Sequence, residues 1–170
     1  MIKDFYDKAN RGSLHKNSHN TPIELFFEPQ EDPIIESADK VRIFEVLSNL
    51  IDNAIKFSSG ETIVISTTKL QNNDNKINHI KDKDLKDGER DIAEKKDQLV
   101  LTAIKDKGEG IDTEIMPRIF NKFVTKSDQG TGLGLYIAKN IVEAHDGQIW
   151  AQNNKNEKGA TFSFSLPLNK

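Results

Sequence analysis

The chain has 170 residues, a formal net charge of −3 and no cysteine. This length predicts a single domain, the lack of cysteine excludes disulfides and Cys/His metal sites, and the charge leaves no basic surface of the kind that binds nucleic acid. No apolar run approaches the roughly 18 residues of a membrane-spanning helix, and the charged segment at residues 1–8 is unlike a signal peptide. We therefore expect a cytoplasmic protein that does not bind nucleic acid.

The N-terminal part of the chain is polar and is expected to lie outside the domain proper. Residues 1–21 contain one short helical pattern at residues 2–9, and we interpret them as a tail or as the end of an interdomain helix. The domain is expected to cover residues 22–170. It should begin with two short strands, at residues 23–27 and 34–36, around a turn that contains proline.

A long amphipathic helix is predicted from about residue 38 to residue 57, because apolar residues recur on one broad arc of it. The opposite arc carries Asn49 and Asn53, one turn apart, with Lys56 close behind. A solvated face is one interpretation, but asparagine is a poor residue for a helix interior, and a plain surface favours Glu, Lys or Gln. The pattern therefore favours two amide oxygens placed for Mg²⁺ bound together with phosphates, and a lysine that adds a point charge for a phosphate.

A polar insertion separates two predicted strands. Residues 62–68 and 99–105 have the β-branched, alternating pattern of strands and are expected to pair. Residues 69–97 between them are almost wholly Lys, Asp, Asn and Glu, and such a composition cannot bury enough apolar area to offset the cost of ordering. We interpret this segment as a long hairpin insertion; a partner-binding loop is the alternative.

The second of these strands ends in a carboxylate. Asp106 follows it directly, and Gly108 and Gly110 come next. A carboxylate at a strand end can accept hydrogen bonds from an exocyclic amine, and the two glycines let a flat ring approach the backbone. Taken alone, the segment also fits a hairpin with a surface aspartate.

Three alternate glycines, Gly130, Gly132 and Gly134, lead into a helical pattern at residues 136–145. Bare backbone N–H groups followed by a helix N-terminus make a cradle for phosphates; a tight loop without a ligand is the alternative. The loop lacks the Lys-Ser/Thr ending of a P-loop, and it does not follow a strand as a dinucleotide-binding turn does. The polar residues before it, 125–129, are interpreted as a mobile lid.

The elements combine into an α+β fold. A short helix and turn at residues 112–123 precede the lid, and a hairpin of residues 148–153 and 160–166 follows the helix that ends at Asp146-Gly147. Strands alternating with helices of this length predict a two-layer α/β sandwich, with one mixed β-sheet and about three helices packed on one face. The ligand is expected between the helices and the lid.

Together these motifs resemble the catalytic and ATP-binding domain of sensor histidine kinases, which has the GHKL ATPase fold shared with gyrase, a heat-shock chaperone and mismatch-repair proteins. The resemblance runs from about residue 23 to residue 168. The boxes occur in the family's order: residues 49–57 resemble the N-box, 106–110 the first glycine box, 119–123 the F-box, 130–135 the second glycine box and 159–167 the closing strand.

The resemblance implies a role for each matched residue. Asn53 and Asn49 would coordinate Mg²⁺, and Asn49 and Lys56 would be the catalytic residues. Asp106 would accept from the adenine amine, with Thr161 supporting it through water. Related ATPases place a carboxylate at the position of Asn49 to activate water, so its absence fits transfer of phosphate to another acceptor.

The remaining expected contacts involve the lid, the glycines and an aromatic side chain. Phe57 would pack on the adenine, Phe120 and Phe123 would anchor the base of the lid, and Lys126 would contact the γ-phosphate. The whole expected ATP site is Asn49, Asn53, Lys56, Phe57, Asp106, Gly108, Gly110, Ile111, Phe120, Phe123, Lys126, Gly130, Thr131, Gly132, Leu133, Gly134 and Thr161.

The phosphoryl acceptor is expected on another domain. The sequence around His19 resembles the acceptor motif only faintly, and too few residues separate it from the N-box helix for two long helices. We therefore interpret the chain as the catalytic domain of a larger protein histidine kinase, inactive alone. A non-catalytic ATP-binding regulatory module and a related anti-sigma-type serine kinase are the alternatives.

The resemblance also implies cofactors and partners. ATP and Mg²⁺ are the expected cofactors. The expected partners are a histidine-bearing helical-hairpin dimerisation domain and a downstream response regulator. The isolated domain would be a monomer and its parent a homodimer, and the domain would be the cytoplasmic part of a sensor if that parent is membrane-bound.

Overall fold

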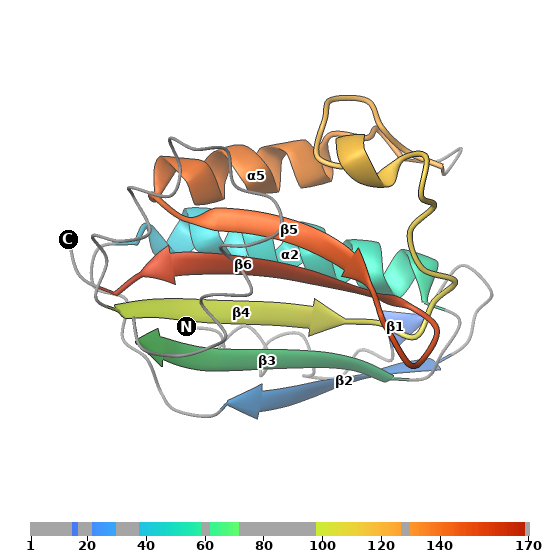
Figure 1. Ribbon diagram of the computed structural model, residues 1–170, viewed down its shortest axis with the longest axis horizontal. Coiled ribbons are helices and arrows are strands. Elements are labelled where there is room, and N and C mark those ends of the chain that lie inside the picture. The colour runs from blue at the N-terminus through green and yellow to red at the C-terminus, as the bar shows by residue number, and fades with distance from the viewer. Residues whose placement is uncertain are drawn as a thin grey trace.

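One mixed β-sheet forms the first layer of the molecule (Figure 1). The computed structural model describes residues 15–16, 22–29, 38–58, 62–71, 98–126 and 130–168. The strands are β1 (His15–Lys16), β2 (Pro22–Pro29), β3 (Thr62–Gln71), β4 (Gln98–Lys105), β5 (Gln148–Asn153) and β6 (Ala160–Pro167). Their order across the sheet is β1-β2-β3-β4-β6-β5; β2 and β3 are parallel, and the other neighbours are antiparallel.

The register of the strands aligns apolar side chains on one face. Ile65 pairs with Ile104, Ile104 with Phe162, and Phe162 with Ala151. The first three side chains are buried in the hydrophobic core, and Ala151 packs against it. Because side chains alternate between the two faces of a strand, this row fixes the face of the sheet that the helices cover.

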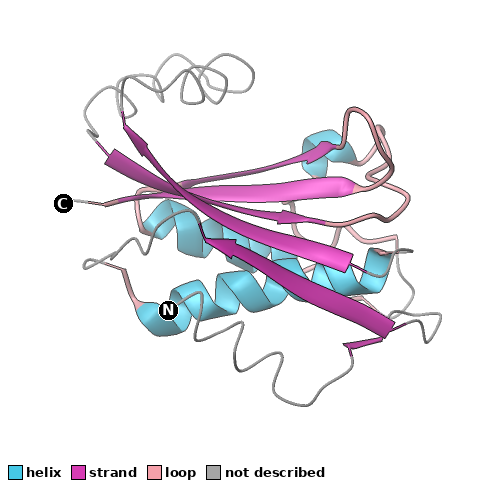
Figure 2. Cartoon of the chain, turned by 90° about the horizontal axis from the view of Figure 1, so that it is seen from below, coloured by secondary structure: helices cyan, strands magenta, loops and turns pink. Residues whose placement is uncertain are grey.

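Two α-helices of the described part of the chain form the second layer, and both lie on one face of the twisted sheet (Figure 2). Helix α2 (Lys40–Phe57) buries the apolar arc that its sequence predicts, Ile43, Val46, Leu47, Leu50, Ile51 and Ala54. Helix α5 (Gly134–Ala144) packs against α2 and buries Ala138, Ile141 and Val142. Between β4 and α5 the chain makes a single 3₁₀ turn, η1 (Met116–Arg118), with Pro117 in it.

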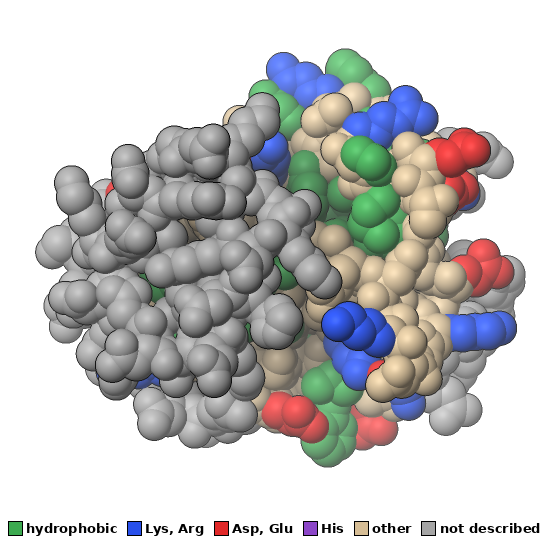
Figure 3. Space-filling model, viewed as in Figure 1, with side chains coloured by type: hydrophobic (Ala, Val, Ile, Leu, Met, Phe, Trp, Pro, Cys, Tyr) green, Lys and Arg blue, Asp and Glu red, His purple; other side chains and the backbone are tan. Residues whose placement is uncertain are grey.

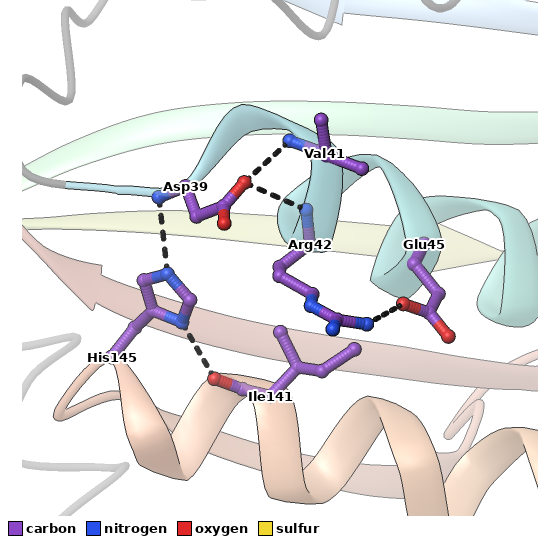
Figure 4. Close-up of polar contacts among 6 residues, drawn as sticks. All are labelled: Asp39, Val41, Arg42, Glu45, Ile141 and His145. Atoms are coloured by element: carbon purple, nitrogen blue, oxygen red, sulfur yellow. Dashed lines mark hydrogen bonds and ion pairs between the residues drawn. The ribbon is translucent and has the colours of Figure 1, made fainter.

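The start of α2 is tied to the end of α5 (Figure 4). The Asp39 carboxylate caps α2 by accepting from the backbone N–H groups of Val41 and Arg42, at 2.9 and 3.2 Å. The Asp39 backbone N–H donates to Nε2 of His145 at 3.1 Å, and Nδ1 of His145 lies 2.7 Å from the Ile141 carbonyl oxygen. His145 therefore holds the two helices together, a structural role in line with its position at a helix end.

The predicted fold class is confirmed. The two α-helices and η1 correspond to the helices expected within the described ranges, and the hairpin of β5 and β6 agrees with the sequence to within a residue. Strand β3 continues to Gln71, beyond its expected end, so part of the predicted insertion belongs to the sheet. The expected helix at residues 2–9, the strand at 34–36 and residues 72–97 of the insertion lie outside the described residues.

The expectation for residues 1–21 needs one correction. His15 and Lys16 pair with Ile23 and Pro22, so this part of the predicted tail adds a short edge strand to the sheet. Among the described residues no helix combines the length and apolar character that crossing a bilayer requires. On the described part of the face shown in Figure 3, basic and acidic side chains are interspersed.

Candidate nucleotide-binding site

A cavity of about 480 Å³ opens at the end of the sheet where the C-terminal half of α2, the loop after β4 and the N-terminus of α5 converge. These segments gather on the right-hand side of Figure 1. The predicted site residues that line the cavity are Asn49, Asn53, Lys56, Phe57, Asp106, Gly110, Ile111, Lys126, Gly130, Thr131, Gly132 and Gly134. The fold therefore brings into one hollow residues that are far apart in the sequence.

Helix α2 supplies the polar wall of the cavity. Asn49, Asn53 and Lys56 project from successive turns of its polar face and line the hollow. Asp52 lines it too, although no role was assigned to it from the sequence; its place on the same polar arc was the available signal. The wall thus combines two amide oxygens, a carboxylate and an ammonium group.

These donors suit a hard cation that is shared with a ligand. The described residues contain no cluster of three or more His, Cys, Asp or Glu side chains that would form a metal site by itself. Amide and carboxylate oxygens are hard ligands, and Mg²⁺ is usually held by few protein groups together with substrate phosphates. The donor set is therefore compatible with Mg²⁺ bound jointly with a nucleotide.

Asp106 provides a buried carboxylate at the inner end of the cavity, with only 3% of its surface exposed. Its Oδ1 accepts from the backbone N–H groups of Gly108, at 2.7 Å, and Ala160, at 3.2 Å. Burial raises the pKa of Asp106 above its ordinary value, and the two backbone hydrogen bonds oppose that rise. Both bonds fall on the same oxygen, so the other oxygen is the one that a ligand's amine would meet.

The loop of residues 106–111 presses against the end of α2. A Cβ on Gly108 would lie 2.2 Å from the carbonyl oxygen of Phe57, so only glycine allows this approach. Gly110 has a φ of +87°, which other residues rarely adopt. Phe57 itself is 42% exposed at the cavity and is available to a flat ring.

The second glycine loop is packed against the backbone of the F-box. Gly132 has a φ of +66°, and a Cβ there would lie 2.6 Å from the carbonyl carbon of Phe123. The Phe123 N–H donates to the Gly132 carbonyl oxygen at 3.0 Å. A Cβ on Gly134 would lie 3.1 Å from Oδ1 of Asn49, so this glycine brings the start of α5 close to the polar wall.

The two F-box phenylalanines differ in burial. Phe120 packs partly buried against the core, but the side chain of Phe123 is 73% exposed. Phe123 has a positive φ of 64°, and it contacts the glycine loop through its backbone. The role of both side chains at the base of the lid stays a prediction. Residues 127–129 of the expected lid lie outside the described residues.

An ion pair spans the mouth of the cavity. Nζ of Lys126 pairs with Oδ2 of Asp112, and both residues line the hollow. The hydrogen bond from Lys126 lowers the pKa of Asp112 below its ordinary value. Asp112 was missed in the sequence, where it reads as the start of a short helix; its Oδ1 also accepts from the Glu114 N–H at 2.8 Å.

Thr161 does not line the cavity, whereas its neighbours Ala160 and Phe162 do. Its hydroxyl donates to Oδ1 of Asn154 at 2.7 Å, and Nδ2 of Asn154 donates to the Asp106 carbonyl oxygen at 3.1 Å. The structure thus links Thr161 to the backbone of Asp106 through Asn154, and the water-mediated contact expected between Thr161 and the Asp106 carboxylate stays a prediction. Gly108, Phe120, Phe123 and Leu133 also lie outside the cavity lining.

Apolar side chains from the segment around η1 complete the hollow. Ile115, Ile119, Val124 and Leu135 line it although no role was assigned to them from the sequence. Ile119 is also part of the hydrophobic core. Their apolar character was the available signal, but it is shared with every core residue and so does not distinguish a cavity wall.

An α+β sandwich with a cavity bordered by glycine loops and amide side chains is typical of a nucleotide-binding domain. The chain belongs to the family described as histidine kinase-, DNA gyrase B-, and HSP90-like ATPase, whose sequence pattern matches residues 38–170. Family membership and fold agree with the resemblance that the boxes indicate.

Relatives with a similar sequence include a sensor protein and a sensor histidine kinase. The chain is 36% identical over 175 aligned residues to sensor protein KdpD from Clostridium acetobutylicum, covering 98% of this chain and 16% of the relative. It is 33% identical to sensor histidine kinase WalK from Bacillus subtilis, covering 82% of this chain and 20% of the relative. The catalytic domain of histidine kinase ThkA has a similar solved structure, with a TM-score of 0.63, 30% identity and coverage of 98% and 89% of the two chains. The chain thus spans less than a fifth of KdpD and matches nearly the whole ThkA catalytic domain.

Proposed function

We propose that this chain is the catalytic, ATP-binding domain of a protein histidine kinase, covering residues 22–170, and that it transfers the γ-phosphoryl group of Mg²⁺-ATP to a histidine on a separate domain. The observation that carries the proposal is the convergence on one cavity of the α2 amides, the buried Asp106 and the glycine loop. The likeness to the sensor histidine kinase WalK and to the catalytic domain of histidine kinase ThkA supports it.

Each wall of the cavity has a part in this function. Asp106 accepts from the exocyclic amine of adenine, and Phe57 packs on the ring. The backbone N–H groups of residues 130–134, at the start of α5, donate to the phosphates. Bound Mg²⁺-ATP supplies the phosphoryl group, with Asn49 and Asn53 as its candidate oxygen ligands, and Lys56 adds positive charge beside the phosphates. In such transfers the protein mainly positions groups and neutralises charge.

The acceptor and the other partners belong to the parent protein. A histidine-bearing helical hairpin that also dimerises would receive the phosphoryl group and pass it to a response regulator. The parent would then be a homodimer whose catalytic domain lies in the cytoplasm. The isolated chain would be monomeric and would not transfer phosphate without that hairpin.

Incubation of the chain with radiolabelled ATP, Mg²⁺ and a purified histidine-bearing hairpin domain tests the proposal. We expect labelling of the hairpin that is acid-labile, as phosphohistidine is, and no labelling of a hairpin whose histidine is replaced by alanine. Asn53→Ala should reduce both Mg²⁺-ATP affinity and transfer, because a metal ligand is lost. ATP binding without transfer would favour a regulatory module, and acid-stable label on a serine would favour a serine kinase.

A further inference from the structure

Two asparagines at the end of β5 hold the loop of residues 106–111 from outside the cavity. Oδ1 of Asn153 accepts from the Ile111 N–H at 2.6 Å, and Nδ2 of the same amide donates to the Ile111 carbonyl oxygen at 2.8 Å. One side chain therefore satisfies both backbone groups of one loop residue, as a neighbouring strand would. Neither Asn153 nor Asn154 lines the cavity.

Asn154 holds the other end of the same loop. Its Nδ2 donates to the carbonyl oxygens of Asp106 and Lys158, at 3.1 and 3.2 Å, while its Oδ1 accepts from the Thr161 hydroxyl. Asp106 is also bonded to Ala160: its N–H donates to the Ala160 carbonyl oxygen at 3.0 Å, and its Oδ1 accepts from the Ala160 N–H at 3.2 Å. The hairpin of β5 and β6 thus fastens the loop at its first and last residues.

The close approach of the hairpin to the loop depends on glycine. A Cβ on Gly110, at a φ of +87°, would lie 2.8 Å from Oδ1 of Asn153. Gly159 has a φ of +105°, and a Cβ there would lie 2.1 Å from the Asp106 carbonyl oxygen. Loop and hairpin are therefore in direct backbone contact, so the position of one fixes the position of the other.

Loop residues Asp106, Gly110 and Ile111 line the part of the cavity that the proposed function assigns to the base, whereas residues 130–134, which it assigns to the phosphates, come from a different segment, at the start of α5. The hydrogen bonds of Asn153 and Asn154 reach only the first of these two segments. Loss of either amide should therefore disturb the base half of the site and spare the phosphate half.

We propose that Asn153 and Asn154 are positioning residues that set the adenine-binding wall through the backbone of Ile111 and Asp106. The proposal rests on the proposed function, since it assigns how that same site selects its base. Asn153 fixes the distance of Ile111 from the ring, and Asn154 fixes the strand end from which the Asp106 carboxylate projects. Neither residue touches the nucleotide.

Binding measurements on the chain itself test this division. Affinities for ATP, adenosine and inorganic tripolyphosphate are measured for the wild type, Asn153→Ala and Asn154→Ala, by displacement of a fluorescent adenine nucleotide. We expect each variant to bind ATP and adenosine about tenfold more weakly, which is a change of about 1.4 kcal/mol, and tripolyphosphate as well as the wild type does. Asn156→Ala, the same change at an exposed residue of the same hairpin, should leave all three affinities unchanged.

Amide exchange gives a readout of the contact itself. The Ile111 amide should lose protection in Asn153→Ala, while the amide of Ala138 in α5 keeps it. If the alanine variant does not fold, Asn153→Asp, which keeps an acceptor for the Ile111 N–H and loses the donor, should show the same pattern to a smaller degree.

Two results would overturn the proposal: adenosine affinity that is unchanged in both folded alanine variants, or adenosine and tripolyphosphate affinities that fall by the same factor. A wild-type chain that binds neither ATP nor adenosine would instead overturn the proposed function.

Discussion

The carboxylate of Asp106 is buried, and it accepts hydrogen bonds from two backbone N–H groups, those of Gly108 and Ala160. Burial favours its protonated form, while an amine donor from a base favours its ionised form. The free protein therefore favours the protonated carboxyl of Asp106, whereas a bound amine favours the ionised carboxylate.

We expect adenosine binding to weaken as the pH is lowered through the raised pKa of Asp106, because the protonated carboxyl accepts from the amine less well. Asp106→Asn should cost about 1–3 kcal/mol at neutral pH, because its one oxygen stays with the two backbone N–H groups and its NH2 group then faces the amine donor. Displacement titrations measure the adenosine affinity of the wild type and of Asp106→Asn over a range of pH. The difference between the two binding free energies separates the titration of Asp106 from that of the ligand. A difference that stays constant from neutral to mildly acid pH would contradict the assignment.

The stability of the free protein should change in the opposite direction. Because the folded state raises the pKa of Asp106, the folded state binds the proton more tightly than the unfolded state does. The resulting stabilisation is complete below the ordinary pKa of an aspartate and is lost as the pH rises through the raised value. Other carboxylates with lowered pKa, such as Asp112, oppose this trend, so the comparison again needs Asp106→Asn.

At the level of elements, the segment between β4 and α5 forms the mouth of the cavity. Asp112 from its first part and Lys126 from its last part pair across the opening. Both side chains are substantially exposed, and exposed pairs contribute only about 0–1 kcal/mol. The pair is therefore weak enough for a phosphate to take Lys126 from Asp112.

Asp112→Asn should release Lys126 and strengthen ATP binding by up to about fivefold. Asparagine keeps an oxygen for the Glu114 N–H, so the turn that Asp112 caps should persist. Calorimetry with ATP and ADP measures the effect, which should be larger for ATP if Lys126 reaches the γ-phosphate. In a Lys126→Ala background, Asp112→Asn should give no gain in ATP affinity. A gain that persists in that background would exclude competition between Asp112 and the phosphate for Lys126.

The glycine loop and the F-box depend on each other through their backbones. Gly132→Val would force a branched side chain into a left-handed conformation and against the backbone of Phe123. We expect ATP binding to be lost while the sheet and α2 remain folded, as judged by circular dichroism and thermal unfolding. Thr113→Val, at an exposed residue outside the cavity lining, is the control and should bind ATP. Normal ATP affinity in Gly132→Val would show that the glycine loop can move away from the backbone of Phe123 without loss of ATP binding.

At the scale of the whole molecule, β3 and β4 pair up to Gln71 and Gln98, the last residues before and the first after a long polar segment. The ends of that segment are already side by side, as they are at a two-residue hairpin. Its composition is too polar to bury enough apolar area to offset the cost of ordering, so we expect the domain to fold without it.

Replacement of residues 72–97 by Asn-Gly should therefore preserve folding and nucleotide binding. The shorter connection lowers the loop-closure cost by about 2 kcal/mol, so the midpoint of thermal unfolding should not fall. Calorimetry with Mg²⁺-ATP compares the affinities of the two chains. Loss of folding or of ATP binding would show that the segment packs on the domain.

Much of the site follows from local rules. The spacing of Asn49 and Asn53 on a helix of period 3.6 places both on one face, and the strand pattern before Asp106 places it at a sheet end. Glycines mark the two loops because close approach and positive φ leave few alternatives. These features depend on neighbours within a few residues, and the sequence alone determined them.

The tertiary structure decided the contacts between distant segments. Asn153 reaches Ile111 across 42 residues and Asn154 reaches Asp106 across 48, and no local period relates such positions. The placement of Thr161 outside the cavity is different, because the alternation of Ala160, Phe162 and Phe164 with polar residues along β6 already puts Thr161 on the opposite face. Local periodicity thus determined the elements and their polar faces, while strand register and loop packing decided which of those residues meet.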